Sequence, residues 1–345
     1  MQETVPLSIP ALRLGAATLP NPVILAPMAG ITDAPVRRMA VRHGAGLVIS
    51  EMLASEALLE GNPEMLLRAE GEGVSFHAVQ IAGNDPRLMG EAARVAQAAG
   101  AGLIDINMGC PAKRVTTGAA GAALLRDLPL ARAIFEAVRG AVSVPVTVKT
   151  RLGWDDGSPT AVALARMAEA CGLSMVTIHG RTRCQFYTGH ADWTAIRAVK
   201  DAVSIPVIAN GDVVHLSDGP AILAASGADG LMIGRGAQGR PWFPGRVAQT
   251  LAGQKVDEDP PIEIQRDILL ELYEGWLSLY GTALGVRQAR KHVGWALEAA
   301  NAGQGPERAA FVARWRKALL VLDEPGRVKN GIMTAYDELM WRAAA

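Results

Sequence analysis

The sequence predicts a (β/α)8 barrel of the TIM type, followed by a small all-helical domain. Short apolar, β-branched runs alternate with longer segments of helical period from about residue 20 to 240. These runs alternate little between polar and apolar residues, so each strand should be buried on both faces, as in a parallel sheet covered by helices. After Pro241 the strand signal stops and only helical periodicity remains.

The expected strands are, in order, Val23–Pro27, Leu47–Ser50, Ser75–Gln80, Leu103–Asn107, Pro145–Lys149, Met175–His179, Pro206–Asn210 and Gly230–Gly234. Eight βα units over about 220 residues fit a barrel better than an open doubly wound sheet. An open sheet would normally carry a dinucleotide fingerprint after its first strand, whereas here that strand runs into Pro27-Met28-Ala29-Gly30.

The domain boundaries follow from this change in the sequence pattern. Residues 1–245 should form the catalytic barrel, and residues 246–260, which run into the acidic stretch Asp257-Glu258-Asp259-Pro260-Pro261, should form a linker. Residues 261–345 should form the helical domain. Helical periodicity covers Ile262–Tyr280, Leu284–Ala300 and Glu307–Leu322.

Composition limits the class of protein. Half of the 345 residues are hydrophobic and 20% are charged, which suits a globular protein that needs neither disulfides nor a metal to fold. The three cysteines are far apart and form no C-x-x-C pair, so we expect no metal site and a reducing cytoplasm. No apolar stretch of about 18 residues predicts a membrane span. We expect a cytoplasmic monomer.

Polar residues stand at the end of nearly every expected strand, which is where TIM barrels carry their chemistry. They are Glu51, Gln80, Asn107, Lys149, His179, Asn210-Gly211-Asp212 and Gly234-Arg235-Gly236. A single polar strand end can be a satisfied cap. So many polar groups at one barrel mouth have no packing rationale, and they indicate a binding site.

Two of these groups indicate the ligand. Gly230–Gly236 and Asn210-Gly211-Asp212 lie after strands seven and eight, where barrels bind phosphate, and Arg235 can add a charge-assisted contact. Gln80 and Lys149 can hydrogen-bond a flat heteroaromatic ring, with Lys149 placing positive charge beside a reduced, anionic flavin. A phosphate site with ring donors across the mouth describes FMN.

The cysteines differ in their expected roles. Cys110 lies on a Gly-Cys-Pro turn at the active-site end of strand four, beside Lys113 and Arg114, where a thiol is accessible and can exchange a proton. Cys171 should be a buried small hydrophobe. Cys184 falls in the loop after strand six, and we favour a structural role for it.

Motifs along the chain resemble those of the tRNA-dihydrouridine synthases. In order they are Leu25–Arg38, Ser50–Met52, Val79–Gly83, Asp105–Val115, Val148–Trp154, Ile178–Arg183, Ala209–Val213 and Met232–Phe243. The run around Cys110 is the most specific of them. The helical tail, with Ala289–Trp295, resembles that of the bacterial B-type branch. One departure is Val36, where an aromatic residue is expected after the Thr-Asp-x-Pro run.

The resemblance implies a set of site residues. It implies that FMN is bound through Pro27, Met28, Ala29, Gln80, Lys149, His179, Asn210, Gly211, Asp212, Gly234 and Arg235. Cys110 would be the general acid, with Asn107 and Arg181 near the substrate base. FMN reduced by NADPH would deliver hydride to C6 of uracil, and Cys110 would protonate C5. The B-type likeness further implies uridine 17 of the tRNA D-loop.

The net charge of zero argues weakly against a nucleic-acid partner. The total hides a split, because residues 286–330 carry nine basic and four acidic residues, and Lys113, Arg114, Arg151, Arg181 and Arg183 add charge near the mouth. A solvated helical face is the simpler alternative. We expect tRNA contacts at the D-loop and elbow from Arg287, Arg290 and Lys291. His292 is either a core residue or a phosphate contact.

Two other functions compete. An FMN barrel that reduces a small pyrimidine, like dihydroorotate dehydrogenase, would share the phosphate site and the lysine. It would lack the Asn-Met-Gly-Cys-Pro run and the helical tail. An RNA-binding protein on an inactive barrel is the non-enzymatic alternative, which the complete set of strand-end groups disfavours.

Overall fold

The computed structural model describes residues 11–300 and 306–344, and the chain divides into two compact units. The first unit lies within residues 1–236 and 244–256, and the second within 237–243 and 257–345. The expected boundary at residue 245 lies close to this division. The short segment 237–243, however, groups with the helical unit.

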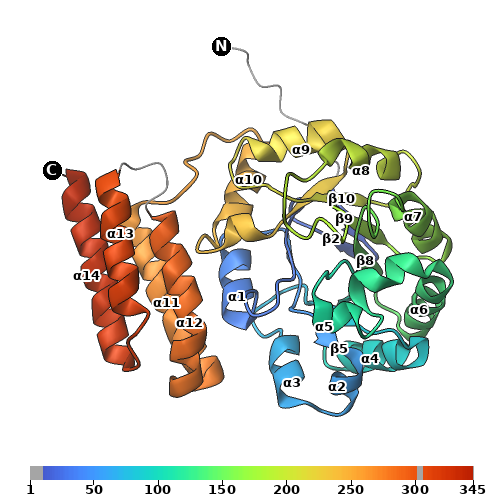
Figure 1. The fold of residues 1–345 in the computed structure, drawn as a ribbon, viewed down its shortest axis with the longest axis horizontal. Coiled ribbons are helices and arrows are strands. Elements are labelled where there is room, and N and C mark those ends of the chain that lie inside the picture. Colours follow the sequence, from blue (N-terminus) through green and yellow to red (C-terminus); the bar gives the residue numbers. More distant parts are fainter. Residues whose placement is uncertain (1–10, 301–305, 345) are drawn as a thin grey trace. The chain divides into compact units, whose positions relative to one another are not determined.

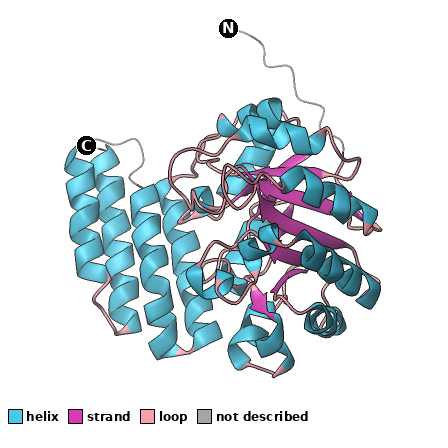
Figure 2. Cartoon of the chain, turned by 45° about the vertical axis from the view of Figure 1, so that its right-hand side comes forward, coloured by secondary structure: helices cyan, strands magenta, loops and turns pink. Residues whose placement is uncertain are grey.

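The first unit is a closed barrel of parallel strands wrapped by helices (Figures 1 and 2). Its strands are β3 Val23–Leu25, β4 Leu47–Val48, β5 Leu53–Ala54, β6 Ala78–Ala82, β7 Leu103–Met108, β8 Val146–Arg151, β9 Met175–His179, β10 Val207–Asn210 and β11 Gly230–Ile233. Their order in the sheet is β4-β3-β11-β10-β9-β8-β7-β6-β5.

The ring closes at the second expected strand, Leu47–Ser50, of which β4 forms the first two residues, while the unexpected β5 follows it. β3 pairs with β11, which joins the first and last expected strands. A parallel bridge between Ile49 and Ala78, with the Ser50 N–H donating to the Ala78 carbonyl at 2.9 Å, joins the segment after β4 to β6. The predicted eight-stranded barrel is therefore confirmed.

A short hairpin covers the N-terminal end of the barrel. It consists of β1 Arg13–Leu14 and β2 Ala17–Thr18, and strands of two residues are too short to show in the sequence pattern. Leu12, Leu14 and Leu19 from this segment are buried against barrel-facing apolar residues such as Ile24 and Met175. This end of the barrel is therefore closed by an apolar layer, and the polar residues at the strand ends lie at the opposite end.

Ten α-helices are described along residues 34–251, and several of them begin at a side-chain cap. They are α1 Ala34–Arg42, α2 Ser55–Leu59, α3 Pro63–Ala69, α4 Pro86–Ala98, α5 Lys113–Thr116, α6 Leu128–Ala141, α7 Ala161–Ala170, α8 Trp193–Lys200, α9 Asp218–Ser226 and α10 Phe243–Leu251, with 3-10 turns η1 Gly121–Arg126 and η2 Arg235–Ala237. Asp85, Asp127 and Asp192 cap α4, α6 and α8, since each carboxylate accepts a backbone N–H in the first turn.

The second unit contains α11 Ile262–Tyr280, α12 Thr282–Ala299, α13 Pro306–Leu319 and α14 Pro325–Ala344. The first three were expected, and α14 was missed. Its buried residues Val328, Ile332, Ala335 and Leu339 recur at helical spacing, so the signal was present in the sequence.

The expected linker, residues 246–260, begins within helix α10 and groups with the first unit up to Val256, whereas its acidic end belongs to the second unit. Arg240 forms ion pairs with Glu258 and Asp259, each at 2.8 Å, and the Trp242 indole donates to Asp259 at 2.9 Å. Residues 257–259 are thereby fixed to the segment 237–243 of the same unit.

Within residues 11–300 and 306–344, no helix is long and apolar enough to cross a membrane. In the same residues, no group of three or more His, Cys, Asp or Glu side chains is placed to hold a metal ion.

Candidate active site

The register of the parallel strands brings the predicted polar residues to one end of the barrel. Asn107 of β7 is opposite Lys149 of β8, and His179 of β9 is opposite Asn210 of β10. Arg151 of β8 is opposite His179. Since all these strands are parallel, their carboxyl ends share one mouth.

The backbone around Cys110 is held by Asn107. The Asn107 side-chain oxygen accepts the N–H of Gly109 at 3.3 Å and that of Cys110 at 3.1 Å. These two donors fix which end of the amide faces the turn. The Asn107 amide nitrogen then points the other way and donates to the Gln80 side-chain oxygen at 2.8 Å.

The same chain of hydrogen bonds continues into the barrel interior. The Gln80 amide nitrogen donates to Asp105 at 2.7 Å, and the other oxygen of that carboxyl group lies 2.6 Å from the Thr147 hydroxyl. Burial raises the pKa of Asp105, although hydrogen bonds from Thr147 and Gln80 and the charge of Lys149 oppose the rise. Asp105 therefore orients Gln80, which in turn orients the residue that holds the cysteine turn.

Cys110 lies at the mouth and is half buried. Lys149 and Arg151 are close enough to interact electrostatically with its thiol. Gly121 packs against the cysteine: a Cβ there would lie 2.9 Å from the Cys110 carbonyl oxygen, and its φ of +61° favours glycine. The exposed Lys113 and Arg114 follow in α5.

Lys149 carries a charge that the protein does not neutralise by hydrogen bonding. Within the described residues its ammonium donates no hydrogen bond, and its side chain is partly exposed at the mouth. Burial, followed by repulsion from Arg151, lowers the pKa of Lys149 to about 8, against the attraction of Asp105 and Cys110. Such an ammonium is suited to an acceptor on a bound ligand.

Arg151 ties two loops of the mouth together. Its Nε donates to the Gly109 carbonyl at 2.7 Å, and its Nη1 donates to the carbonyls of Thr182 and Phe186 at 2.9 and 2.8 Å. Burial lowers the pKa of Arg151 to about 10. The side chain predicted to face RNA thus mainly fixes the cysteine turn to the loop after β9.

Arg181 is buried and uses every N–H of its guanidinium within the protein. Its Nε donates to the Thr188 carbonyl and one Nη2 hydrogen to the Gly189 carbonyl, at 3.1 and 2.8 Å. Both terminal nitrogens bind Asp212, at 2.9 and 2.6 Å. Nη1 also lies 3.2 Å from the His179 Nε2. Arginine has five N–H donors, so all are engaged.

Asp212 links the loops after β9 and β10. It also accepts the Ala191 N–H at 2.7 Å and lies 3.3 Å from Arg235. Burial alone would raise the pKa of Asp212, but the hydrogen bonds from Arg181 and Ala191 and the charges of Arg181 and Arg235 lower it. Asp212 is ionised, and its backbone holds a φ of +55°, an uncommon value outside glycine.

Two glycines shape the expected phosphate end. Gly211 presses against its neighbours, because a Cβ there would lie 2.6 Å from the Ala191 Cβ and 3.1 Å from the His179 ring. At Gly234 an added Cβ would meet only ordinary contacts, 3.7 Å to the Met28 sulfur and 3.8 Å to the Ala26 Cβ. The protein's own contacts therefore do not require glycine at 234.

The Pro27–Gly30 turn is fixed by residues that the sequence analysis did not assign. The Thr32 hydroxyl accepts the Met28 N–H at 2.8 Å, and the Gly30 N–H donates to the buried Glu51 carboxylate. Glu51 also lies 3.9 Å from Arg68 of α3. Glu51 was noted as a strand-end residue, but its partners could not be read from the sequence.

Tyr187 is the largest mouth residue that sequence reasoning missed. It is 51% exposed, and its ring centroid lies 6.4 Å from that of His179. The guanidinium carbons of Arg151 and Arg235 lie 5.4 and 4.9 Å from the ring. Tyr187 occurs in an irregular loop without any pattern. Asp105 was also not assigned, although a charged residue within an apolar strand is a signal that the sequence does carry.

The other two cysteines are away from the site contacts described above. Cys171 ends α7 and is half buried rather than fully buried, and burial raises the pKa of its thiol. Cys184 is exposed, and its backbone N–H donates to the Trp154 carbonyl at 2.9 Å.

In the helical unit, the predicted RNA-contact residues differ in whether their side chains are already bound to other protein groups. Arg287 is exposed. Arg290 pairs with Asp323 at 2.5 Å, and Lys291 donates to Gln288 at 2.7 Å. The pairs Arg314–Glu338, Arg316–Glu298 and Lys329–Glu274 also form. Much of the basic excess is thus used inside the unit.

His292 is a core residue. It is buried, its ring stacks on Trp276 with centroids 4.4 Å apart, and it meets the edge of Trp295 at 5.3 Å. The alternative of a phosphate contact is not compatible with this burial.

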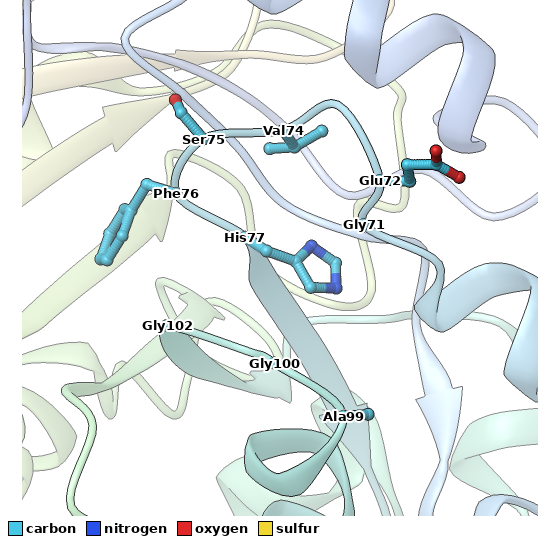
Figure 3. A pocket seen from close by; sticks show the side chains of 9 residues that line it. All are labelled: Gly71, Glu72, Val74, Ser75, Phe76, His77, Ala99, Gly100 and Gly102. Atoms are coloured by element: carbon cyan, nitrogen blue, oxygen red, sulfur yellow. The ribbon is translucent and has the colours of Figure 1, made fainter.

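A cavity of about 240 Å³ lies outside the mouth. Its lining residues come from the segments that precede β6 and β7, including the Phe76 and His77 rings shown in Figure 3. This is the N-terminal end of those strands, where barrels carry stability rather than chemistry.

The closed barrel and the convergent mouth define a (β/α)8-barrel enzyme. The profile of the family described as dihydrouridine synthase (Dus) matches residues 24–317. A probable tRNA-dihydrouridine synthase of Rhodobacter capsulatus is 51% identical over 84% of this chain and 90% of its own length. A tRNA-dihydrouridine synthase B of Pseudomonas putida is 48% identical over 88% of this chain and 90% of its own.

The chain belongs to the dihydrouridine synthase family, and the predicted resemblance, B-type branch included, is confirmed. The prediction of a flavin-dependent oxidoreductase is confirmed with it.

Solved structures support the fold alone. A 6-hydroxypseudooxynicotine amine oxidase of Pseudomonas geniculata has a TM-score of 0.54 at 15% identity, covering 71% of this chain and 49% of that chain. A histamine dehydrogenase of Rhizobium sp. 4-9 has a TM-score of 0.53 at 13% identity, covering 82% and 50%. The chain spans about half the length of each.

Proposed function

We propose that the protein reduces a uridine of tRNA to 5,6-dihydrouridine, with FMN held at the barrel mouth and NADPH as reductant. One observation carries the proposal beyond family membership. The Cys110 turn and the Lys149 ammonium meet at the same mouth, so an acid and a flavin-binding cation can act on opposite sides of one base.

The residues present fit a flavin with a phosphate tail. Lys149 offers an ammonium without a hydrogen-bond partner among the described residues, and Gly234, which the protein's own contacts do not require, would let a phosphate oxygen come close to the backbone. Arg235, which is about half exposed, adds positive charge at that end. Pro27, Met28 and Ala29 lie in the turn held by Glu51 and can support the ring. Gln80, His179 and Asn210-Gly211-Asp212 complete the expected set.

Cys110 would donate the proton. When bound, FMN would supply the hydride that adds to C6 of the uracil ring, with electrons from NADPH. The Cys110 thiol would give its proton to C5, so the C5–C6 double bond becomes single and the base gains two hydrogens. Asn107 and Arg151 hold the turn that carries the thiol. Proton donation by a positioned acid contributes typically about 10²–10⁴-fold to the rate.

The target base must leave the tRNA stack to reach the mouth, at a cost of a few kcal/mol. Exposed Lys113 and Arg114 beside Cys110 are suited to phosphate contacts that repay this cost. In the helical unit Arg287 is exposed for the same role. Uridine 17 of the D-loop is the proposed target, because relatives named as B-type match this chain. A cytoplasmic location and a monomeric state remain predictions.

The test is mass analysis of tRNA after incubation with protein, FMN and NADPH. Wild-type protein should add two hydrogens to one uridine, and Cys110→Ala should add none. Cys184→Ala is the matched control, since it removes an accessible thiol that makes no described side-chain contact at the site. Turnover of free uracil or dihydroorotate without any change in tRNA would refute the tRNA proposal, and loss of a D-loop position other than 17 in a deletion strain would refute the assignment of the target.

A further inference from the structure

The loop after β9 holds an ion-paired arginine against a histidine of the mouth. Arg181 is 1% exposed, and His179 is 7% exposed. Because all five Arg181 donors already bind protein atoms, none remains for a substrate base. The family resemblance places this arginine near the base, and its hydrogen bonds indicate a different task.

The contact between the two side chains fixes where the His179 proton lies. A guanidinium can only donate, so the His179 Nε2 must accept from the Arg181 Nη1 at 3.2 Å. An Nε2 that accepts carries no proton. The imidazole is then neutral with its proton on Nδ1, and Nδ1 takes part in no hydrogen bond among the described residues.

The charges around the ring favour the same state. Burial lowers the pKa of His179 well below its ordinary value, and Lys149, Arg151, Arg181 and Arg235 lower it further. The facing carboxylate, Asp212, is already paired with Arg181 and Arg235. Tyr187 is a further titratable neighbour, with its ring centroid 6.4 Å from that of His179. An imidazolium has no counter-charge of its own here.

Two further contacts fix the geometry of the pair. Asp212 holds both terminal nitrogens of Arg181, so the guanidinium plane cannot turn. Gly211, with φ +126°, lies against the edge of the His179 ring, where a Cβ would be 3.1 Å from its Cδ2. The ring is therefore held on two sides, and the arrangement is built from β9, the loop that follows it and the loop after β10.

We propose that Arg181, anchored by Asp212, is a positioning residue that locks His179 as the neutral Nδ1–H tautomer and so presents one hydrogen-bond donor to the flavin. The inference rests on the proposed function only for the identity of that ligand. It assigns Arg181 no contact with the substrate base. Because the ring stays neutral, the donor is the same across the physiological pH range.

The first experiment needs neither flavin nor tRNA. Long-range ¹H–¹⁵N correlation spectra of the full chain, labelled at histidine, report the tautomer of each ring, and His179→Gln identifies the His179 signals. The wild type should show the Nδ1–H pattern without titration from pH 5.5 to 8. A protonated Nε2 or a titration within that range in the wild type would overturn the proposal.

The second experiment uses variants. Arg181→Met should allow both tautomers and bring the His179 titration into view, whereas Arg181→Lys, which keeps the charge but not the fork, should release the tautomer with less effect on titration. Arg183→Met is the matched control, because Arg183 stacks on Trp154 and Phe186 in the same loop and not on His179. An unchanged spectrum in Arg181→Met would contradict the lock. If Arg181→Met does not fold, the proposal is tested by the tautomer seen in the wild-type spectrum and by the spectrum of Asp212→Asn, which weakens the anchor of Arg181.

Flavin titration provides a third readout. Losing one positioned hydrogen bond should weaken FMN binding by Arg181→Met about 5- to 10-fold at pH 7 and make it dependent on pH between 5.5 and 7. Unchanged FMN affinity together with a raised KM for tRNA would refute the proposal in favour of a base contact. A protein that shows the tautomer but does not reduce tRNA would refute the proposed function alone.

Discussion

Lys149→Met should stabilise the flavin-free protein at pH 7. Burial and Arg151 lower the pKa of Lys149 from an ordinary 10.5 to about 8, which means that the fold binds this proton less tightly than the unfolded chain does. A tenfold change in proton affinity is about 1.4 kcal/mol, so the charged lysine costs the fold roughly 3 kcal/mol. Methionine has a similar length and no charge, and it should recover most of this cost.

The lowered pKa also fixes the direction in which the stability cost of Lys149 changes with pH. Below about pH 8 the lysine is charged in both states and the full cost applies. Between pH 8 and 10.5 the folded protein releases the proton first, so the stability contributed by this group rises with pH, and above 10.5 no cost remains. The advantage of Lys149→Met over wild type should therefore fall to roughly 1 kcal/mol at pH 9.5.

Urea unfolding of the flavin-free protein at pH 7 and 9.5, followed by circular dichroism, measures both quantities. A Lys149→Met variant less stable than wild type at pH 7, or a stability difference that does not change with pH, would refute the reasoning. Flavin affinity should move the other way. Since a hydrogen bond to a charged group is worth about 1.5–3 kcal/mol, the variant should bind FMN about 10- to 150-fold more weakly.

Three further substitutions test the supports of the mouth. Asp105→Leu leaves the buried Gln80 amide and Thr147 hydroxyl without their partner, so it should lower the free energy of unfolding in urea by roughly 2–4 kcal/mol. Asp105→Asn can form a hydrogen bond to both groups and should lower it by about 1 kcal/mol or less. Equal losses in the two variants would mean that these hydrogen bonds do not stabilise the fold. Glu51→Ala removes the acceptor of the Gly30 N–H and should weaken FMN binding about 10-fold in a fluorescence titration, with Glu51→Gln retaining most of the affinity. Gly234→Ala should leave unfolding within about 0.5 kcal/mol of wild type but impair FMN binding, because its Cβ meets only ordinary protein contacts; unimpaired binding would place the phosphate elsewhere.

The barrel could be predicted because its signal is repeated and local. Each strand is a short apolar run, and Asp85, Asp127 and Asp192 mark where three of the helices begin. Among the features that were missed, α14 carries such a signal, whereas the hairpin and the break between β4 and β5 do not. The hairpin strands have two residues each, and the break between β4 and β5 depends on how the ring closes at Ile49 and Ala78.

The positions of the site residues were predictable, but their hydrogen bonds were not. A strand-end residue is placed by the period of two and the barrel geometry, so Gln80, Asn107 and Lys149 follow from the sequence. Whether a side chain faces a ligand or the protein depends on partners far away in the chain. Arg181 meets Asp212 because two loops adjoin, a relation between residues 31 positions apart that no local pattern encodes.

The cationic side chains of the mouth thus differ in whether their N–H groups already donate to other groups of the protein. Arg151 and Arg181 donate to backbone carbonyls and to the Asp212 carboxylate, so their charge is committed to the loops. Lys149 has no such bond, and its lowered pKa measures the cost of keeping it so. A strongly perturbed pKa in a site is the signature of a group that a ligand completes, and we propose that FMN completes this ammonium. On this proposal Lys149 and the half-exposed Arg235 carry the flavin-facing charge, while Arg151 and Arg181 keep the thiol and the imidazole in place around it.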